Sequence, residues 1–199
     1  MAVDPENRLW WRSPLRRLEA EALRDAMLAV AGELDPQMRG SLLHVKNRAY
    51  FFDHTSKDLT TYDSRRRSLY LPVVRNNVFD LFGLLDFPDP AVSTGDRATT
   101  VVASQALLML NSEFVMQAAA GFADRLLAKP GSDDQRLSRL YVIAFGREPT
   151  NVEQQADLAF LAALAKARSA RPAAEKLQRE AWATLCHVVL AANEFIYLR

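Results

Sequence analysis

Residues 65–76 read Arg65-Arg66-Arg67-Ser68-Leu69-Tyr70-Leu71-Pro72-Val73-Val74-Arg75-Asn76, and the motif Phe87-Pro88-Asp89-Pro90 follows shortly after. Across 65–114, arginines, prolines and small polar residues alternate with apolar residues, without the 3.6-residue period of an amphipathic helix. The sequence on both sides has that period. We therefore predict one mainly α-helical domain over 1–199. It comprises a first helix within 1–36, an irregular insertion at 37–98 with a β-containing part near 40–98, and a helical bundle or array at 99–199.

The composition is that of an ordinary globular protein. Of 199 residues, 49% are hydrophobic and 25% are charged, which allows one good core. The net charge of +1 argues against a general electrostatic grip on nucleic acid. No run approaches the roughly 18 apolar residues of a membrane span, and residues 1–8 lack the apolar segment of a signal peptide. With Cys186 as its single cysteine, the chain has no internal disulfide.

The first helix is predicted to start at Ser13-Pro14, because serine caps first turns and proline is tolerated there. Gly32 and Asp35-Pro36 are expected to end it. In the insertion, residues 42–45, 50–52 and 68–71 are candidate short strands. Residues 79–85 are predicted to form a short turn or helix, and 86–96 a loop.

Several local signals mark helix ends in the C-terminal half. Thr99 or Thr100 is expected to cap a helix that runs to Asn111, where Ser112 starts the next one. Asp133 is expected to cap a helix that Gly146 stops.

The last two helices follow from the same kind of signal. Thr150 and Glu153 have the spacing of a capping box, and Pro172 falls in the first turn of the last helix. The apolar ending at 194–198 predicts a terminus that docks on the core.

No constellation names a reaction or a metal. Cys186 and His187 are neighbours on a helix and point about 100° apart, so core packing explains the thiol better than Cys–His catalysis. His44, His54 and His187 lack metal-ligand spacing. We therefore predict no catalytic residue, no metal and no cofactor in this chain.

Paired carboxylates are the remaining enzymatic alternative. Asp86 with Asp89, or Glu113 with Glu194, have the chemistry for glycoside cleavage, but the sequence does not give their separation. Nucleotide-binding, dinucleotide-binding and nucleophile-elbow motifs are absent from the sequence.

The arginines of the 65–97 region allow two interpretations. One is an internal network that pins loops to helices through acids such as Glu19, Asp25, Asp80 or Asp86. The other is a site for sulfate or carboxylate groups of a sugar polymer, because guanidinium forks suit anions. For the second, the candidate ligand-binding residues are Arg67, Arg75, Arg97, Asp80 and Asp86.

An ordered set of motifs spans essentially the whole chain. It includes Asn7-Arg8-Leu9-Trp10-Trp11-Arg12, Arg66-Arg67-Ser68-Leu69-Tyr70, Phe87-Pro88-Asp89-Pro90, Leu110-Asn111-Ser112, Gly146-Arg147 and Asn193-Glu194-Phe195. Together they resemble a domain of unknown function from planctomycete-type bacteria. One departure is Ala103, where that family typically has proline.

The resemblance implies a context and assigns no activity. Such domains lie at the C-terminal end of large exported proteins, which often carry a cytochrome-c-like domain upstream. It implies a periplasmic or extracellular location, haem only on an upstream domain, and other domains of a larger polypeptide as partners. Because the motifs begin so near Met1, we expect this chain to be the C-terminal part of a larger family domain.

Three functional hypotheses follow. The first is a non-catalytic interaction or ligand-binding module. The second is an enzyme domain that acts on an anionic extracellular polysaccharide, with Asp80, Asp86 or Asp89 as acid or base. The third is a truncated fragment without independent function, which predicts an exposed apolar patch.

Overall fold

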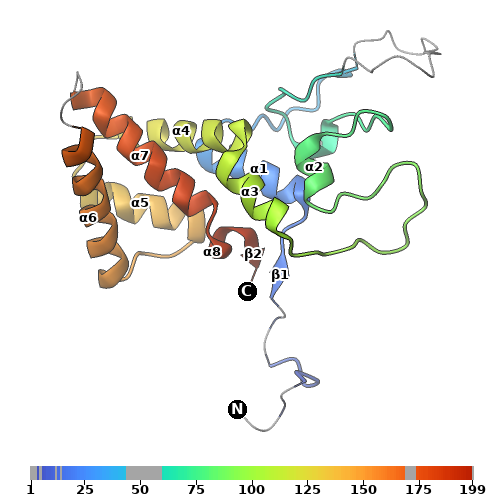
Figure 1. Cartoon of the computed structure of the whole chain (residues 1–199), viewed down its shortest axis with the longest axis horizontal. Helices are drawn as coiled ribbons and strands as arrows, with labels where there is room; N and C mark the ends of the chain where they lie inside the picture. Colours follow the sequence, from blue (N-terminus) through green and yellow to red (C-terminus); the bar gives the residue numbers. More distant parts are fainter. Residues whose placement is uncertain are drawn as a thin grey trace.

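In the computed structural model of the chain, the described residues are 4, 6–11, 13, 15–43, 60–168 and 174–198. The predicted mainly helical fold is confirmed (Figure 1). The helices are Ala20–Ala31 (α1), Asp80–Leu84 (α2), Ala103–Asn111 (α3), Glu113–Leu127 (α4), Asp133–Phe145 (α5), Asn151–Arg168 (α6), Ala174–Leu190 (α7) and Asn193–Ile196 (α8), with a 3-10 helix at Ser68–Tyr70 (η1) and strands at Arg16–Arg17 (β1) and Tyr197–Leu198 (β2).

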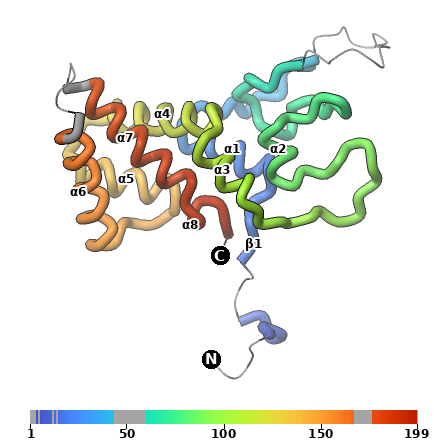
Figure 2. Tube along the Cα trace, in the orientation of Figure 1, coloured from blue at the N-terminus to red at the C-terminus, as the bar shows by residue number. Residues whose placement is uncertain are grey.

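Helix α4 is the centre of the core. Its buried side chains recur every three or four residues, which gives a continuous apolar face. That face packs against α7 and α1, and Figure 2 shows α7 crossing α4. Alanines at 118, 119 and 123 are small enough to allow close packing, while Phe122 and the Trp182 side chain of α7 fill the core.

Helices α5 and α6 pack together, and both contact α7. The predicted stop at Gly146 is confirmed, as is the stop of α1 at Gly32. Both glycines adopt the left-handed conformation, with φ of 70° and 77°. The N-cap of α5 is Ser132, so the prediction of Asp133 is wrong by one residue. The Ser132 hydroxyl accepts a hydrogen bond from Gln135 N at 3.3 Å.

The residues just before α1 meet the C-terminal residues in a small antiparallel sheet. Arg16 pairs with Leu198, and Leu18 N donates to Ile196 O at 2.8 Å. The predicted helix start at Ser13-Pro14 is therefore wrong. Residues 16–17 are extended because they pair with β2, and α1 begins only at Ala20. The predicted docking of 194–198 is confirmed, since Phe195 is buried.

Two other local predictions fail for tertiary reasons. The strand predicted at 68–71 is wrong, because the Asp25 carboxylate accepts from Ser68 N at 2.8 Å and from Ser68 Oγ at 2.7 Å, at the start of η1. The threonine cap of α3 is also wrong. Thr100 bonds to Asp86 instead, and α3 starts after Val102.

Some predictions lie outside the described residues, namely the strand at 50–52, part of the strand at 42–45, and Pro172. The predicted loop at 86–96 is confirmed, as is the short helix predicted within 79–85, which is α2. Among the described helices, none alone is long and apolar enough to cross a membrane. Helices α3 and α4 meet that test of length and composition only jointly, with a 49° bend between them.

Candidate functional site

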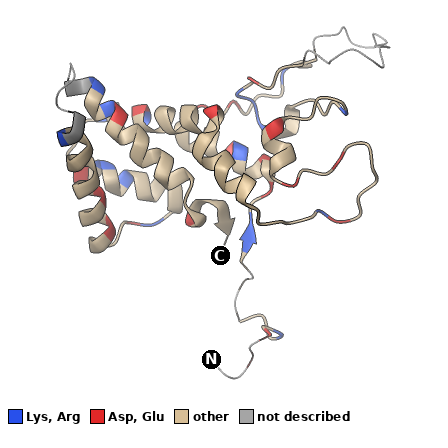
Figure 3. Ribbon diagram, viewed as in Figure 1, with Lys and Arg blue, Asp and Glu red and all other residues tan. Residues whose placement is uncertain are grey.

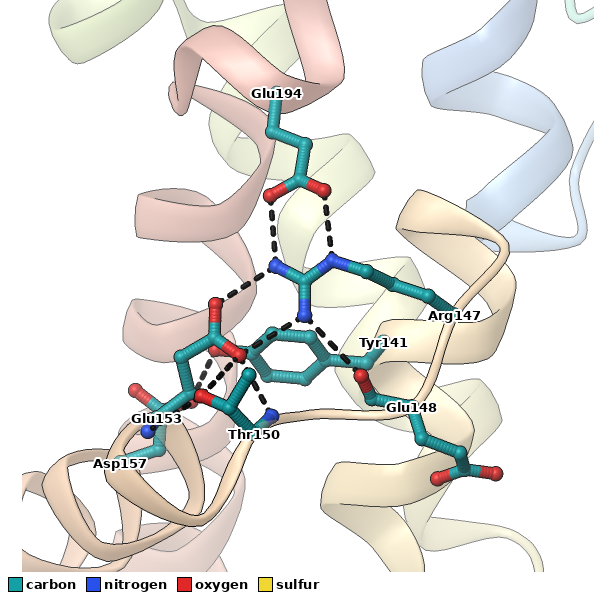
Figure 4. Close-up of polar contacts among 7 residues, drawn as sticks. All are labelled: Tyr141, Arg147, Glu148, Thr150, Glu153, Asp157 and Glu194. Carbon is teal, nitrogen blue, oxygen red and sulfur yellow. Dashed lines mark hydrogen bonds and ion pairs between the residues drawn. The ribbon is translucent and has the colours of Figure 1, made fainter.

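A cluster of polar side chains surrounds Arg147, at the junction of α5 and α6 (Figure 4). Gly146 ends α5 in the left-handed conformation, and the next side chain reaches between α6 and α8. Arg147 Nε and Nη2 donate to the two Glu194 oxygens at 2.8 Å each. Its Nη2 and Nη1 donate to the two Glu153 oxygens at 2.7 and 2.9 Å. The guanidinium therefore joins the start of α6 to α8 through two bidentate pairs.

Glu153 also completes the predicted capping box, which is confirmed. Its Oε2 accepts from Thr150 N at 2.7 Å, and Thr150 Oγ1 accepts from Glu153 N at 3.3 Å. The hydrogen bonds from Arg147, and then that from Thr150 N, lower the pKa of Glu153 to about 2. The bonds to Glu194 and Glu153 raise the pKa of Arg147. In this Arg147 cluster Glu153 is therefore ionised, and all four carboxylate oxygens of Glu153 and Glu194 accept hydrogen bonds.

Tyr141 lies beneath the guanidinium, with its ring centroid 5.2 Å from Arg147 Cζ. Its hydroxyl donates to Asp157 Oδ2 at 2.9 Å. Burial, and then the Asp157 hydrogen bond, raise the pKa of Tyr141. Burial also raises the pKa of Asp157, although the bond from Tyr141 opposes that shift. Tyr141 and Asp157 are therefore hydrogen-bonded to each other, in an arrangement suited to fixing α5 against α6.

A second cluster surrounds Asp86, which has a left-handed φ of 62°. Its carboxylate accepts from Arg17 Nη2 at 2.6 Å, from Thr100 N at 2.8 Å and from Thr100 Oγ1 at 2.7 Å. Gln105 Nε2 adds a bond at 3.2 Å. Burial alone would raise the pKa of Asp86, but the bonds from Thr100, together with the charge of Arg17, leave it lowered. This Asp86 cluster joins β1, the 86–100 loop and α3.

The predicted arginines differ in how they are paired. Arg97 contacts Glu19 Oε2 at 3.1 Å and Glu21 Oε1 at 2.8 Å. Arg67 is 49% exposed and lies 3.9 Å from Asp25 Oδ2. Arg75 is exposed and forms no ion pair with any residue that the structure describes. Of the four acids predicted as partners of an internal arginine network, Glu19, Asp25 and Asp86 pair with arginines, whereas Asp80 pairs with no described arginine.

The five candidate ligand-binding residues do not gather at one place. Asp86 and Arg97 line a polar cavity of about 400 Å³, beside Arg17 and Glu19. Asp80 lines a different cavity, and Arg67 and Arg75 line neither of the two.

The cavity at Asp80 has a volume of about 510 Å³, and we call it the Asp80 cavity. It brings together three segments that are separate in the sequence: 62–65, 77–80 and 113–117. Its lining residues are Tyr62, Asp63, Ser64, Arg65, Asn77, Val78, Phe79, Asp80, Glu113, Phe114 and Gln117.

Aromatic rings form one part of this lining. Tyr62 stacks on Phe79 with 5.0 Å between centroids, and Phe114 meets Phe79 edge to face at 6.4 Å. The Tyr62 hydroxyl donates to Asn77 O at 2.5 Å, which holds the first segment against the second.

Carboxylates form the other part. Asp80 lies in the first turn of α2 and Glu113 in the first turn of α4, where the helix dipole favours negative charge. Both are exposed, as is Asp63. The one lining arginine, Arg65, pairs with Glu33 at 3.0 Å. The cavity therefore has an excess of negative charge.

The other candidates are placed as follows. Cys186 is buried, and burial raises the pKa of its thiol. His187 Nε2 lies 2.8 Å from Met109 O, in the last turn of α3. Among the described residues there is no group of three or more side chains that could hold a metal ion. His44 and His54 lie outside that part of the chain.

The carboxylates suggested as catalytic pairs have separate partners or surroundings in the structure. Glu194 binds Arg147, Glu113 lines the Asp80 cavity, and Asp89 caps its own loop by accepting from Ala91 N at 2.8 Å. The sequence analysis did not predict that Arg147 binds Glu153 and Glu194. The signal that could have pointed there is the presence of Gly146-Arg147 and Asn193-Glu194-Phe195 among the motifs that carry the family resemblance.

Comparison with known proteins gives one result. Residues 1–161 match a family described as PSD1, protein of unknown function (DUF1553). No curated protein and no solved structure matches the chain. The matched region contains the Asp86 cluster, the Asp80 cavity and all of the Arg147 cluster except Glu194.

Proposed function

We propose that this chain, which belongs to the PSD1 family of proteins of unknown function (DUF1553), is a non-catalytic ligand-binding module whose ligand occupies the Asp80 cavity. The observation that carries the proposal is the meeting of three aromatic rings and three carboxylates from separate segments around one open cavity. The Asp86 cluster also borders a cavity, of about 400 Å³, but the charged groups there are paired with one another, as they are in the Arg147 cluster.

The size and lining of the cavity suit a ligand with hydroxyl or amino groups. Its volume of about 510 Å³ falls within the usual range of ligand sites, roughly 300–1,000 Å³. Exposed carboxylates accept hydrogen bonds from such groups, and Asn77 and Gln117 bring amide groups to the lining. The excess of carboxylates over Arg65 favours neutral or cationic groups over sulfate or carboxylate. An amino-bearing polysaccharide has the required chemistry.

Exposure of these carboxylates supports a binding role over catalysis. A glycosidase needs one carboxyl group whose pKa is raised by apolar surroundings, opposite a second carboxylate. Asp63, Asp80 and Glu113 are all exposed to solvent. Among the residues that the structure describes, the carboxyl group with a raised pKa is that of Asp157, which is bonded to Tyr141 outside the cavity lining.

The wider context belongs to the same proposal. The resemblance to exported planctomycete proteins supports a role as one domain of a larger periplasmic or extracellular polypeptide. In that arrangement any haem sits on a separate cytochrome-c-like domain, and this chain contributes ligand or partner binding.

Thermal unfolding tests the proposal, because a ligand that binds only the folded state raises Tm. The chain is melted alone and with neutral, amino-bearing, and sulfated or carboxylated polysaccharides. We expect the neutral or amino-bearing class to raise Tm, by an amount equivalent to about 2.7 kcal/mol at a hundredfold excess over Kd.

Two variants locate the effect. Asp80→Asn keeps a side chain that suits a helix start but removes the charge, so it should abolish the shift. Asp89→Asn is the matched control, since its amide oxygen can still accept from Ala91 N. A shift caused only by sulfated or carboxylated polymers, and retained in Asp80→Asn, would contradict the Asp80 cavity and favour an anionic-glycan site. A cooperative melt without any shift would contradict polysaccharide binding altogether.

A further inference from the structure

Two places in this fold combine an aromatic ring, two carboxylates and an arginine. In the Arg147 cluster the guanidinium lies against a tyrosine ring and binds two glutamates. Beside α1, Arg97 Cζ lies 5.6 Å from the centroid of the Phe87 ring. Arg97 also contacts Glu19 Oε2 at 3.1 Å and Glu21 Oε1 at 2.8 Å. Each place binds a cation through carboxylate charge and through the negative face of a ring.

The Asp80 cavity combines rings and carboxylates in the same way, and Figure 3 shows acidic residues on both α2 and α4. Its carboxylates, however, are not paired. Asp63, Asp80 and Glu113 form no ion pair with any residue that the structure describes. The lining arginine, Arg65, is paired with Glu33 at 3.0 Å. Within the described chain, the carboxylates of this cavity therefore have no arginine to neutralise them.

Arg24 lies behind the cavity lining and keeps its walls in place. Its side chain is fully buried, with Cζ 5.6 Å from the centroid of the Phe114 ring. The guanidinium donates to Ser64 O, and to Arg66 O at 2.9 Å. Its charge is offset by Asp25 at 3.4 Å. Arg24 therefore joins two of the three lining segments without entering the cavity.

We propose that the Asp80 cavity binds the protonated amino group of an amino sugar, which supplies the cation that an arginine supplies in the two other places. This inference rests on the proposed function and narrows its ligand to sugars whose amine is free and charged. Asp80 and Glu113 accept hydrogen bonds from the ammonium group, and the aromatic rings of the lining contact the apolar face of the sugar.

The size of the cavity favours an amino sugar over a basic side chain of a partner protein. Its volume of about 510 Å³ is more than one lysine or arginine side chain fills. The lining also includes Ser64 and Gln117, whose hydroxyl and amide groups suit the hydroxyl groups of a sugar.

Isothermal titration calorimetry with two matched oligosaccharides tests the proposal on the 199-residue chain. One is a hexamer of β-1,4-linked glucosamine, used at a pH below the pKa of its amines, where they are charged. The other is its fully N-acetylated counterpart, whose amides are neutral. We expect the free-amine hexamer to bind about tenfold more tightly or better, as for the gain of one charge-assisted hydrogen bond.

Glu113→Gln removes one charge from the cavity and should weaken binding of the free-amine hexamer by about tenfold. Asp134→Asn is the matched control, because Asp134 is also exposed in the first turn of a helix, α5. Asp134 accepts from Gln154 Nε2 at 2.8 Å, much as Glu113 accepts from Gln117 Nε2 at 3.0 Å. The control should bind as the wild type does.

Gln117→Arg tests the comparison with the two arginine-containing places. The introduced guanidinium lies one helical turn after Glu113, a spacing at which opposite charges pair and stabilise a helix. The variant should therefore melt at or above the Tm of the wild type. It should also weaken binding of the free-amine hexamer by about tenfold or more, because its own cation competes for the carboxylate.

Equal binding of the two hexamers would overturn this inference and leave the proposed function in place. Binding of neither would overturn both. A hexalysine peptide that binds more tightly than the free-amine hexamer would overturn the amino-sugar class and favour a basic partner protein. Unchanged binding in Glu113→Gln, or an equal loss in Asp134→Asn, would place the ammonium group outside the Asp80 cavity.

Discussion

The helices α4 to α7 and the segment 60–102 are held together in different ways. In the first region, apolar side chains at helical spacing meet across α4 and α7, around Phe122 and Trp182. In the second, buried arginines donate to backbone oxygens. Arg24 is fully buried and donates to Arg66 O at 2.9 Å and to Ser64 O. The Arg66 guanidinium in turn donates to Gly40 O at 2.7 Å and to Met38 O.

This difference teaches how a segment with little regular structure can stay folded. Backbone carbonyls that are buried without helix or sheet partners cost free energy, and guanidinium groups supply several donors at once. The same device appears at the end of α1, where Arg125 Nη1 donates to Ala29 O at 3.0 Å and Val30 O at 2.8 Å. Residues near the Asp80 cavity thus depend on polar bonds that reach them from α1.

The largest effect is expected in the apolar region. Phe122→Ala removes a fully buried ring from α4 and leaves a cavity in the core. We expect the free energy of unfolding to fall by about 3–5 kcal/mol, measured by urea denaturation. Met116→Ala, on the exposed side of the same helix, is the control and should cost far less. Similar losses in both variants would contradict the central place of α4.

A somewhat smaller but more local effect is expected in the arginine-held region. Arg24→Met keeps much of the buried volume but leaves the carbonyls of Ser64 and Arg66 without this donor. The free energy of unfolding should fall by about 2–4 kcal/mol, because buried polar groups lose their partners. In hydrogen exchange, amides of η1 should lose more protection than amides of α4 and α7.

Arg67→Met is the control for that experiment. Its guanidinium is half exposed and lies at the edge of ion-pair distance from Asp25, so it should cost at most about 0.5 kcal/mol. If Arg24→Met left η1 as protected as in the wild type, the two regions would not differ in the way described above.

The smallest effect is expected at the Arg147 cluster, which is partly exposed. Arg147→Met should lower the free energy of unfolding by about 1 kcal/mol at neutral pH, because solvent screens the ion pairs. The pKa of Glu153 is lowered in the folded state from 4.5 to about 2, so its contribution is complete above the unfolded-state pKa and is lost as the pH falls toward 2.

The wild type and the variant should therefore differ most above about pH 5 and converge as the pH approaches 2. Urea denaturation at several pH values measures the difference. Arg136→Met is a comparison variant, because Arg136 forms an ion pair within one turn of α5. A difference that grows at low pH would show that Arg147 acts in some other way.

Local signals in the sequence determined much of the helical architecture. The stops at Gly32 and Gly146, the break at Asn111-Ser112 and the Thr150–Glu153 capping box were all predicted, and the structure contains them. Each depends on residues within one helical turn of one another, so the chain nearby contains the information.

The candidate sites could be predicted only in part. Glu19, Asp25, Asp80 and Asp86 were named as arginine partners, and all but Asp80 pair with a described arginine. The sequence did not show that Asp80 and Asp86 line different cavities. The aromatic lining of the Asp80 cavity was also missed. Tyr62, Phe79 and Phe114 come from three segments, and no spacing rule connects them.

The remaining features were decided by tertiary structure alone. Residues 16–17 look like the start of a helix until β2, at the other end of the chain, supplies strand hydrogen bonds. Residues 68–70 have the alternation of a strand until the Asp25 carboxylate binds Ser68. Local sequence determined where most helices end, because those hydrogen bonds close within a turn. Only the folded chain determined the rest, because distant partners replaced the locally preferred hydrogen bonds.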